Sequence, residues 1–383
     1  MTAADSNDES MMREALRLAR RGAGRTHPNP SVGAVVYRGK KILGRGTTRP
    51  PGGAHAEIVA IEKARRAYGA RSLRGASIAV TLEPCNFAGR TGPCTEAILE
   101  AGLGRVVAGA RDPHPRVSGT GFRRLQRGGV EVTRGVLDEE CQRQHRGFIS
   151  VCERRRPFVT LKLATSLDGR IALANGESRW ITSDRARQFV HRLRAENDAI
   201  LVGSETALAD DPVLTARRGE RVVRRPVRIL LDGRLRVSPE ARLFEPAGDS
   251  RTWVMCRARA RGISRIRNCA ERVLELPGGE GRHVDLREGF RRLAREGLTT
   301  VLVEGGGALA AALMRADLVD EVHWMLAPKL IGSDGKPGLG PLGFSRLLDI
   351  VELDAIRTRR IGPDLHVSGA VRRKPARKKG MKR

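Results

Sequence analysis

The chain has 383 residues, too long for a typical single domain and comfortable for two, and 40% of them are apolar. Its net charge of +28 favours anionic partners, but the basic residues are spread along the chain and aromatic residues make up only 3%, so no specific nucleic-acid partner is expected. No stretch approaches the roughly 20 apolar residues of a membrane span, and no secretory signal is recognisable, so we expect a cytoplasmic protein with reduced thiols and no membrane partner.

The first part of the chain alternates between helical and strand patterns. Apolar residues recur at helical spacing after Ser10, a favourable N-cap, and two short β-rich runs flank an Arg-Gly-Lys turn. We expect a helix over 10–24, a hairpin over 32–46, further helices over 55–67, 94–102 and 121–129, and strands over 76–84, 105–110 and 130–136. This alternation predicts a three-layer α/β domain over residues 1–150.

A charged segment that contains a proline, residues 153–158, marks a domain boundary. A second alternating pattern follows, and we expect another α/β domain over residues 156–370. Its expected strands lie over 158–169, 198–206, 227–233, 252–256, 299–307 and 321–332, and its helices over 183–197, 287–297 and 308–318. Residues 371–383 are basic and are expected to form a disordered tail.

Three candidate metal ligands stand in the first domain. His55 is at the start of an expected helix, Cys94 is at the start of another, and Cys85 is in the loop that leads to it. One imidazole and two thiolates leave a tetrahedral zinc with one open position, as in catalytic zinc sites. Glu57 lies two residues after His55, so its carboxylate can reach a metal-bound water. It can act as the catalytic acid and base by accepting a proton from that water and delivering it again. This order of residues is that of zinc-dependent deaminases.

Two alternatives remain open for this group of residues. His55 could cap a helix while the two cysteines pack in a core. A nucleic-acid-binding deaminase would combine the same zinc ligands with the high positive charge. The remaining cysteines have no ligand-like neighbours and are expected to be buried or inert: Cys141, Cys152, Cys256 and Cys269.

The spacing of the two candidate zinc-binding cysteines distinguishes this chain from many other zinc-dependent deaminases. Eight residues separate Cys85 from Cys94, whereas many deaminases have two between their cysteines. The chain also carries, in order, HPNPSVGAVV, HAE, TLEPC, GRTGPC, ARDPHPRVSGTG, KLATSLDGRIA, SRWIT, LADDPVLT, VEGG and APKLIG. With these motifs it resembles the bifunctional riboflavin-biosynthesis deaminase/reductase family over nearly its whole length.

The resemblance implies an α/β fold with a cytidine-deaminase-like domain followed by a dihydrofolate-reductase-like domain. The implied substrate is 2,5-diamino-6-ribosylamino-4-pyrimidinone 5′-phosphate, with Asn29 against the pyrimidine and Arg90 against the phosphate. Thr48 and Phe87 depart from the family, which often has histidine at both positions near the substrate. The same two chemistries on a related pyrimidine of a secondary pathway are therefore an alternative.

Two expected strands of the second domain run into glycine-containing turns that open helices. These turns, over 201–206 and 301–307, suit the phosphates of a dinucleotide. The resemblance implies that NADPH binds here and reduces the ribosyl group of the deaminated intermediate to ribityl. It places the cofactor against Ala164, Trp180, Thr206, Asp210, Gly233 and Gly306, and the substrate against Ser178, Arg194, Leu214, Arg217 and Glu304.

Several residues of the second domain have a purely structural alternative. Trp180 could belong to a core, Asp210 could cap a helix, and Lys162 and Asp168 could stabilise the end of a strand. No residue is identifiable as the general acid of the reduction. The expected cofactors are Zn²⁺ and NADPH, the expected partner is a phosphorylated small-molecule pyrimidine, and the expected assembly is a homo-oligomer.

Overall fold

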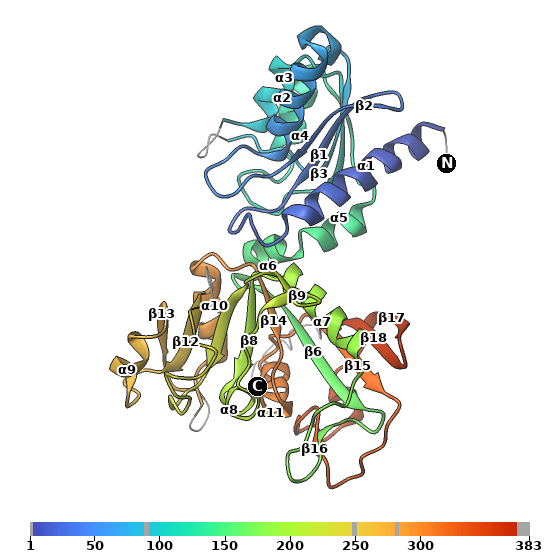
Figure 1. Cartoon of the computed structure of the whole chain (residues 1–383). Coiled ribbons are helices and arrows are strands. Elements are labelled where there is room, and N and C mark those ends of the chain that lie inside the picture. Colours follow the sequence, from blue (N-terminus) through green and yellow to red (C-terminus); the bar gives the residue numbers. More distant parts are fainter. Residues whose placement is uncertain (1–2, 88–91, 247–250, 280–282, 374–383) are drawn as a thin grey trace, which may run out of the picture. The chain divides into compact units, whose positions relative to one another are not determined.

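The computed structural model describes residues 3–87, 92–246, 251–279 and 283–373 (Figure 1). The chain divides into two compact units: unit 1 comprises Met1–Pro157 with Leu293–Thr299, and unit 2 comprises Phe158–Arg292 with Thr300–Arg383. Helix α6 (Arg146–Arg154) belongs to unit 1, although the sequence places the end of that domain near residue 150. None of the described helices combines the length and apolar character needed to cross a bilayer.

Unit 1 is built around a mixed sheet whose five described strands lie in the order β2-β1-β3-β4-β5. β1 pairs antiparallel with β2 and with β3, whereas β3, β4 and β5 run parallel. These strands are β1 (Gly33–Arg38), β2 (Lys41–Thr47), β3 (Ser77–Leu82), β4 (Arg105–Ala110) and β5 (Glu131–Thr133). β3 and β4 are buried along almost their whole length, as strands covered on both faces must be.

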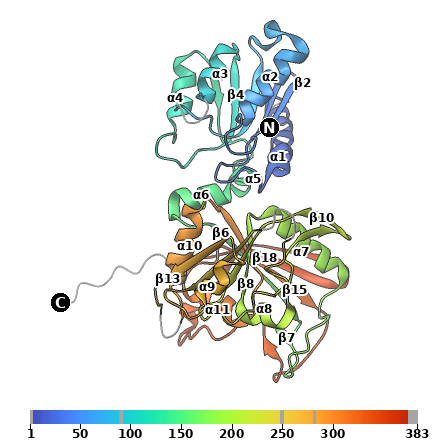
Figure 2. The same cartoon turned by 60° about the vertical axis from the view of Figure 1, so that its left-hand side comes forward.

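Helices cover both faces of the unit 1 sheet, which gives the expected three layers (Figures 1 and 2). α1 (Ala3–Gly22) and α5 (Asp138–Gln144) lie on one face. α2 (Ala56–Tyr68), α3 (Cys94–Glu100) and α4 (Thr120–Arg127) lie on the other. The second set matters for function, because the candidate ligands His55 and Cys94 stand at the starts of α2 and α3.

The first helix is longer than the sequence pattern indicates. We expected it to begin at Ser10, but α1 begins at Ala3 and Ser10 lies inside it. The extension brings Asp8 against the sheet, where its buried carboxylate accepts hydrogen bonds from the Tyr37 hydroxyl (2.9 Å) and from two guanidinium nitrogens of Arg105 (2.8 and 3.0 Å). These tertiary contacts outweigh the local capping preference of Ser10.

Unit 2 contains a sheet whose nine described strands lie in the order β13-β12-β11-β8-β14-β6-β15-β18-β17. From β13 to β15 the neighbours run parallel, and β18 and β17 continue the sheet antiparallel. The strands are β6 (Phe158–Ser166), β8 (Ala199–Gly203), β11 (Val227–Leu231), β12 (Thr252–Arg257), β13 (Arg272–Leu276), β14 (Thr300–Val303), β15 (Glu321–Ala327), β17 (Leu353–Ile361) and β18 (Asp364–Val371). Two short antiparallel pairs complete the unit: β9 (Ala216–Arg218) and β10 (Arg221–Arg224) form a hairpin, and β7 (Arg170–Ala172) pairs with the distant β16 (Lys336–Pro337).

The helices of unit 2 are α7 (Asp184–Glu196), α8 (Ser204–Asp210), α9 (Ile263–Arg267) and α11 (Gly307–Arg315), together with most of α10 (Leu286–Arg295), whose last residues belong to the Leu293–Thr299 segment of unit 1. Ser183 caps α7, since its hydroxyl accepts a hydrogen bond from Ala186 N–H (3.3 Å). Phe189 and Leu193 of α7 pack against Leu302 of β14 and Met325 of β15. α7 therefore covers the middle of the sheet.

The terminal hairpin of β17 and β18 escaped sequence analysis. Ala355 to Arg360 are all exposed in β17, so this edge strand shows no apolar alternation that would reveal it. The start of the expected basic tail lies beside it, where Arg372 forms ion pairs with Glu352 and Asp354. Residues 374–383, the rest of that expected tail, lie outside the described residues.

The buried His145 predicts an acid-sensitive unit 1. His145 is 2% exposed at the end of α5, and burial lowers its pKa to about 4, below the ordinary value of about 6.5. As the pH falls, the unfolded state therefore takes up this proton first, and the stabilisation present above pH 6.5 is lost toward pH 4. From pH 7 to pH 5 we expect a loss of about 2 kcal/mol, measured by hydrogen exchange of the unit 1 core amides.

Substitution separates this effect from other titrations. His145→Gln should flatten the pH dependence even if it lowers stability at pH 7, because the amide does not titrate. Equal slopes in the wild type and in His145→Gln would show that His145 is not the sensitive group.

Candidate active sites

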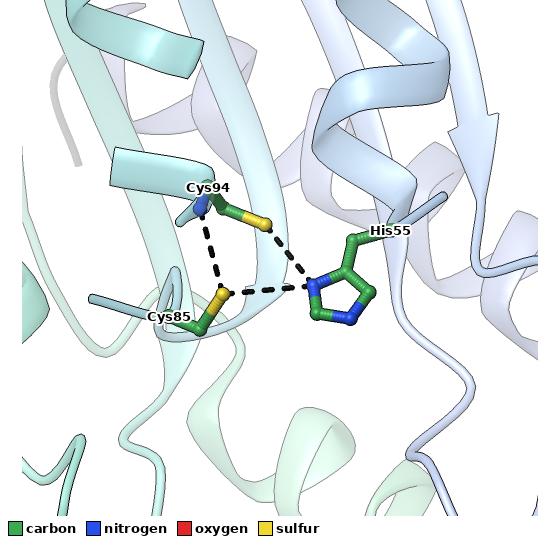
Figure 3. A group of neighbouring side chains, drawn as sticks. All are labelled: His55, Cys85 and Cys94. Atoms are coloured by element: carbon green, nitrogen blue, oxygen red, sulfur yellow. Dashed lines mark hydrogen bonds between the residues drawn. The ribbon is translucent and has the colours of Figure 1, made fainter. Parts of the chain in front are cut away.

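The three candidate zinc ligands converge in unit 1 (Figure 3). His55 immediately precedes α2, Cys94 is the first residue of α3, and Cys85 follows β3. The His55 Nδ1 atom lies 3.2 Å from Cys94 Sγ and 3.6 Å from Cys85 Sγ, and the three ligand atoms are all within 4.8 Å of one another. Bonds of about 2.0 Å to nitrogen and 2.3 Å to sulfur at tetrahedral angles put such atoms about 3.5 Å apart, so this donor set fits zinc.

The electrostatics of the cluster favour a bound cation. The hydrogen bond with Cys94 lowers the pKa of the Cys85 thiol to about 4, and the hydrogen bond with Cys85 raises the pKa of His55. The contact with Cys85 also raises the pKa of the Cys94 thiol. The two thiols thus share one proton, and a dication bound to both would replace that proton and keep both sulfurs ionised.

Glu57 lies on the first turn of α2, beside the zinc cluster. Its side chain is buried, and this burial raises the pKa of its carboxyl to about 7. Glu57 shares a cavity of about 390 Å³ with His55 and Cys85 of the cluster, and its lining also includes Asn29, Thr48, Phe87, Asp112 and His114. The structure therefore brings Asn29 to the cluster, while Arg90, the expected phosphate ligand, lies outside the described residues.

Sequence reasoning assigned no role to two polar side chains of this cavity, Asp112 and His114. Asp112 is buried, and burial raises the pKa of its carboxyl to about 6. Its Oδ1 accepts a hydrogen bond from His114 N–H (2.7 Å), and the His114 ring stacks on Phe87 with the centroids 6.0 Å apart. Both belong to the motif ARDPHP, which contributed to the family resemblance without pointing to a ligand.

Glu83 fixes the wall of the cavity that carries Asp112 and His114. Its buried carboxylate accepts hydrogen bonds from the N–H groups of Gly119 (2.9 Å) and Gly121 (3.1 Å), with longer ones from Asp112 and Phe122 (both 3.4 Å). A carboxylate is the side chain that can accept this many backbone donors at once. The glutamate of TLEPC is therefore a positioning residue for the loop between β4 and α4.

In unit 2, two of the expected substrate residues bind each other. Arg194 of α7 and Glu304, which follows β14, form a bidentate ion pair of 2.6 and 2.9 Å, and both are largely buried. Lys162 of β6 adds a third charge: burial lowers the pKa of its ammonium group, and the nearby Glu304 opposes this shift. Arg217 instead donates from Nε to the Thr215 hydroxyl (3.0 Å).

Two structural alternatives from the sequence are decided by the geometry. Trp180 is 63% exposed and its ring is covered by Arg187, whose guanidinium carbon is 4.2 Å from the ring centroid, so Trp180 is not a core residue. Asp168 does stabilise a strand exit: its carboxylate accepts hydrogen bonds from the N–H groups of Ile331 (3.1 Å) and Gly332 (2.7 Å). Asp168 therefore ties the turn after β6 to the segment after β15.

A second cavity, of about 550 Å³, opens at the carboxyl ends of β8, β11 and β14. Thr206, Gly233 and Gly306 line it, and Gly306 N–H donates to the Thr206 hydroxyl (3.2 Å) immediately before α11. In parallel α/β sheets, ligands bind at the carboxyl ends of the strands, and glycines there allow a phosphate to approach backbone N–H groups closely. The lining thus suits a dinucleotide.

The other expected cofactor and substrate residues of unit 2 lie outside that lining. Besides Arg194, Arg217 and Glu304, described above, they are Ala164 on β6, Ser178 and Trp180 after β7, Asp210 at the end of α8, and Leu214, which is buried next to Thr215. Arg179 Nη2 lies 3.9 Å from Asp210 Oδ1, which links the Trp180 segment to α8.

Comparison with known proteins identifies the family. A model described as the cytidine and deoxycytidylate deaminase zinc-binding region matches residues 5–110, and one described as the RibD C-terminal domain matches residues 157–367. The riboflavin biosynthesis protein RibD of Escherichia coli is 41% identical, in a match that covers 95% of this chain and 100% of that protein. The chain belongs to the RibD family.

Other RibD proteins agree in sequence and structure. RibD of Bacillus amyloliquefaciens is 38% identical over 94% of this chain and 95% of its own. Acinetobacter baumannii RibD has a TM-score of 0.83 at 31% identity, covering 96% of this chain and 100% of that one. A deaminase/reductase structure from Thermotoga maritima has the same TM-score at 36% identity, covering 96% and 99%.

The RibD assignment confirms the expected fold class and the expected pair of enzymatic activities. The chain combines a zinc-binding deaminase domain, a hydrolase, with a RibD reductase domain, an oxidoreductase, and it acts in riboflavin biosynthesis.

Loss of one thiolate should abolish metal binding. For Cys85→Ser we expect zinc content to fall from about one ion per chain to below about 0.1, because a serine hydroxyl is a far weaker ligand than a thiolate. Metal analysis after dialysis against a weak chelator measures this. Cys152→Ser, a change at a free cysteine of α6, should retain zinc, and retention by Cys85→Ser would remove this cluster as the metal site.

The Glu83 contacts predict a local loss of order. Glu83→Gln leaves buried backbone donors unsatisfied, so we expect a destabilisation of about 1–3 kcal/mol and faster hydrogen exchange over residues 112–122. Glu96→Gln is the control, because Glu96 pairs with Arg124 on the surface and should cost less than about 1 kcal/mol. Unchanged exchange over 112–122 in Glu83→Gln would contradict a positioning role.

Proposed function

We propose that unit 1 hydrolyses an exocyclic amine of 2,5-diamino-6-ribosylamino-4-pyrimidinone 5′-phosphate and that unit 2 then reduces the ribosyl group to ribityl with NADPH. The observation that carries the first step is the cavity that Glu57 shares with His55 and Cys85, two members of the cluster that Cys94 completes. The Thermotoga maritima relative supports both substrates, since it is described as a diaminohydroxyphosphoribosylaminopyrimidine deaminase and 5-amino-6-(5-phosphoribosylamino)uracil reductase.

In unit 1, Glu57 is proposed as the catalytic acid and base. When bound, zinc supplies the Lewis acidity that activates a water molecule for attack on the amine-bearing ring carbon. Glu57 accepts the proton of that water and delivers it to the leaving nitrogen. Its burial raises the pKa of the carboxyl to about 7, which makes the proton easy to accept, and a nearby dication would draw the pKa back down and ease its release.

The substrate of unit 1 is proposed to lie along the same cavity. Asn29 can donate and accept hydrogen bonds at the pyrimidine edge, and the ring pair of Phe87 and His114 offers a flat wall. Arg90 is proposed to bind the ribose phosphate, as a guanidinium can do with two parallel hydrogen bonds.

In unit 2, NADPH is proposed to lie along the strand ends, with Thr206, Gly233 and Gly306 against it. When bound, NADPH supplies the hydride that reduces C1 of the opened sugar. The proposed nicotinamide end lies toward β6, where Ala164, Trp180 and Asp210 complete the cofactor contacts proposed from the family resemblance.

Two arginines on the substrate side of unit 2, Arg194 and Arg217, are proposed to have different roles. Glu304 already neutralises Arg194, so this buried pair orients the pocket, while Arg217 keeps its charge for the substrate phosphate. Ser178 and Leu214 are proposed to complete the substrate contacts.

A related pyrimidine is the second candidate substrate of unit 1. It is favoured by the lining of the cavity, where Thr48 and Phe87 stand at positions often occupied by histidine in the family. Comparison of ammonia release from the ribotide and from its dephosphorylated and 5-deamino analogues decides between the two substrates.

We also propose that the protein self-associates. Its partner is proposed to be a small molecule and not a nucleic acid. Leu330, Leu347 and Leu348 are 76%, 84% and 83% exposed, which leaves apolar surface uncovered on one copy of the chain. Sedimentation of the purified protein tests the assembly.

Substitution of Glu57 should separate the two activities. Glu57→Gln keeps the shape of the carboxylate but cannot carry a proton, so we expect ammonia release to fall at least about 100-fold while NADPH oxidation with the deaminated intermediate is retained. Ammonia and NADPH assays with each substrate measure both steps. Glu62→Gln, an exposed change on the same helix, is the control. Ammonia release that survives in Glu57→Gln would refute its role.

A further inference from the structure

The 550 Å³ cavity of unit 2 is basic at its β11 end. In the sheet order β11-β8-β14-β6, β11 is three strand spacings, about 14 Å, from β6. The turn that follows β11 contributes Arg234 and Arg236 to the cavity lining, and both side chains are exposed. A dinucleotide with its nicotinamide toward β6 therefore places its adenosine ribose beside this turn.

The two arginines have their charge available for a ligand. Within the described residues, the Arg234 guanidinium forms no hydrogen bond or ion pair, and that of Arg236 contacts only a neutral group, the Ser204 hydroxyl (2.6 Å). A third arginine of the lining, Arg315, donates to the Pro341 carbonyl. Uncompensated guanidinium groups on a concave surface are the usual protein ligands of phosphate.

The carboxylate of Asp232, at the end of β11, is engaged in hydrogen bonds within the protein. Asp232 is 1% exposed, and its oxygens accept hydrogen bonds from the N–H groups of Arg234 (3.3 Å) and Val237 (2.9 Å). Sites that prefer NAD use a carboxylate of the sheet edge to bind the ribose 2′-hydroxyl, whereas an arginine accommodates a 2′-phosphate. Asp232 instead shapes the turn that presents the arginines. The other carboxylate of the lining, Glu205, is exposed and belongs to α8.

We propose that Arg234 and Arg236 bind the 2′-phosphate of NADPH and make unit 2 select NADPH over NADH. The inference rests on the proposed function, namely that unit 2 binds a nicotinamide dinucleotide in this cavity. It adds the residues that set the cofactor preference. Arg234 and Arg236 do not reach the reacting atoms in this arrangement, so they act on binding and not on the hydride step.

Equilibrium titration of the full-length protein tests the proposal without relying on turnover. NADPH and NADH are titrated against the wild type, Arg234→Ala, Arg236→Ala and the double variant, followed by the fluorescence of the reduced nicotinamide. A charge-assisted hydrogen bond is worth about 1.5–3 kcal/mol, so we expect each variant to weaken NADPH binding about tenfold or more and NADH binding less than about twofold. In competition, 2′,5′-ADP should bind the wild type better than 5′-AMP and lose this advantage in the double variant.

A matched control removes the effect of net charge. Arg261→Ala deletes an exposed arginine of unit 2 outside the cavity and should leave both dissociation constants unchanged. Equal weakening of NADPH and NADH by the cavity variants would assign the arginines to the pyrophosphate and overturn the proposal, as would an unchanged preference for NADPH. A wild type that binds neither dinucleotide would instead refute the proposed reductase cofactor itself. Melting temperatures of all variants verify that they are folded.

Discussion

The meeting of one imidazole nitrogen and two sulfurs within 4.8 Å is the constraint on which the deaminase half depends. Three separate segments must end at one point for this to occur: the start of α2, the start of α3 and the exit of β3. A cation bound to both sulfurs would stabilise their ionised forms at this point. The sheet and the helices of unit 1 thus assemble the donor set of a metal site, and the same geometry places Glu57 in one cavity with His55 and Cys85.

Both units place their chemistry at the carboxyl ends of parallel strands. In unit 1, Glu83 and Cys85 follow β3, and Asp112 follows β4. In unit 2, Gly203 ends β8, Asp232 follows β11, and Glu304 follows β14. The loops at this edge extend from a rigid sheet. The sheet holds the ends of the loops in place, and the side chains of neighbouring loops converge on one site. Two different folds thus meet the same requirement for a preorganised site.

The sequence was sufficient to predict features that depend on residues close together in the chain. Two of the three candidate zinc ligands, His55 and Cys94, stand at helix starts that the sequence pattern predicts, and the strand over 105–110 was predicted with the bounds of β4. It was insufficient where distant residues decide the outcome. Asp8 draws α1 past Ser10 through contacts with Tyr37 and Arg105, and the exposed β17 has no apolar alternation. Asp112 and the pairing of Arg194 with Glu304 emerge only when segments far apart in sequence are brought together.

Glu83 and Cys85 are separated by a single proline, and this closeness has a mechanical consequence. Glu83 holds the loop that bears Asp112 and His114, while Cys85 holds one corner of the metal cluster. The exit of β3 therefore positions both a candidate metal ligand and a wall of the neighbouring cavity. A substitution that shifts the end of β3 would therefore act on both parts of the candidate deaminase site at once.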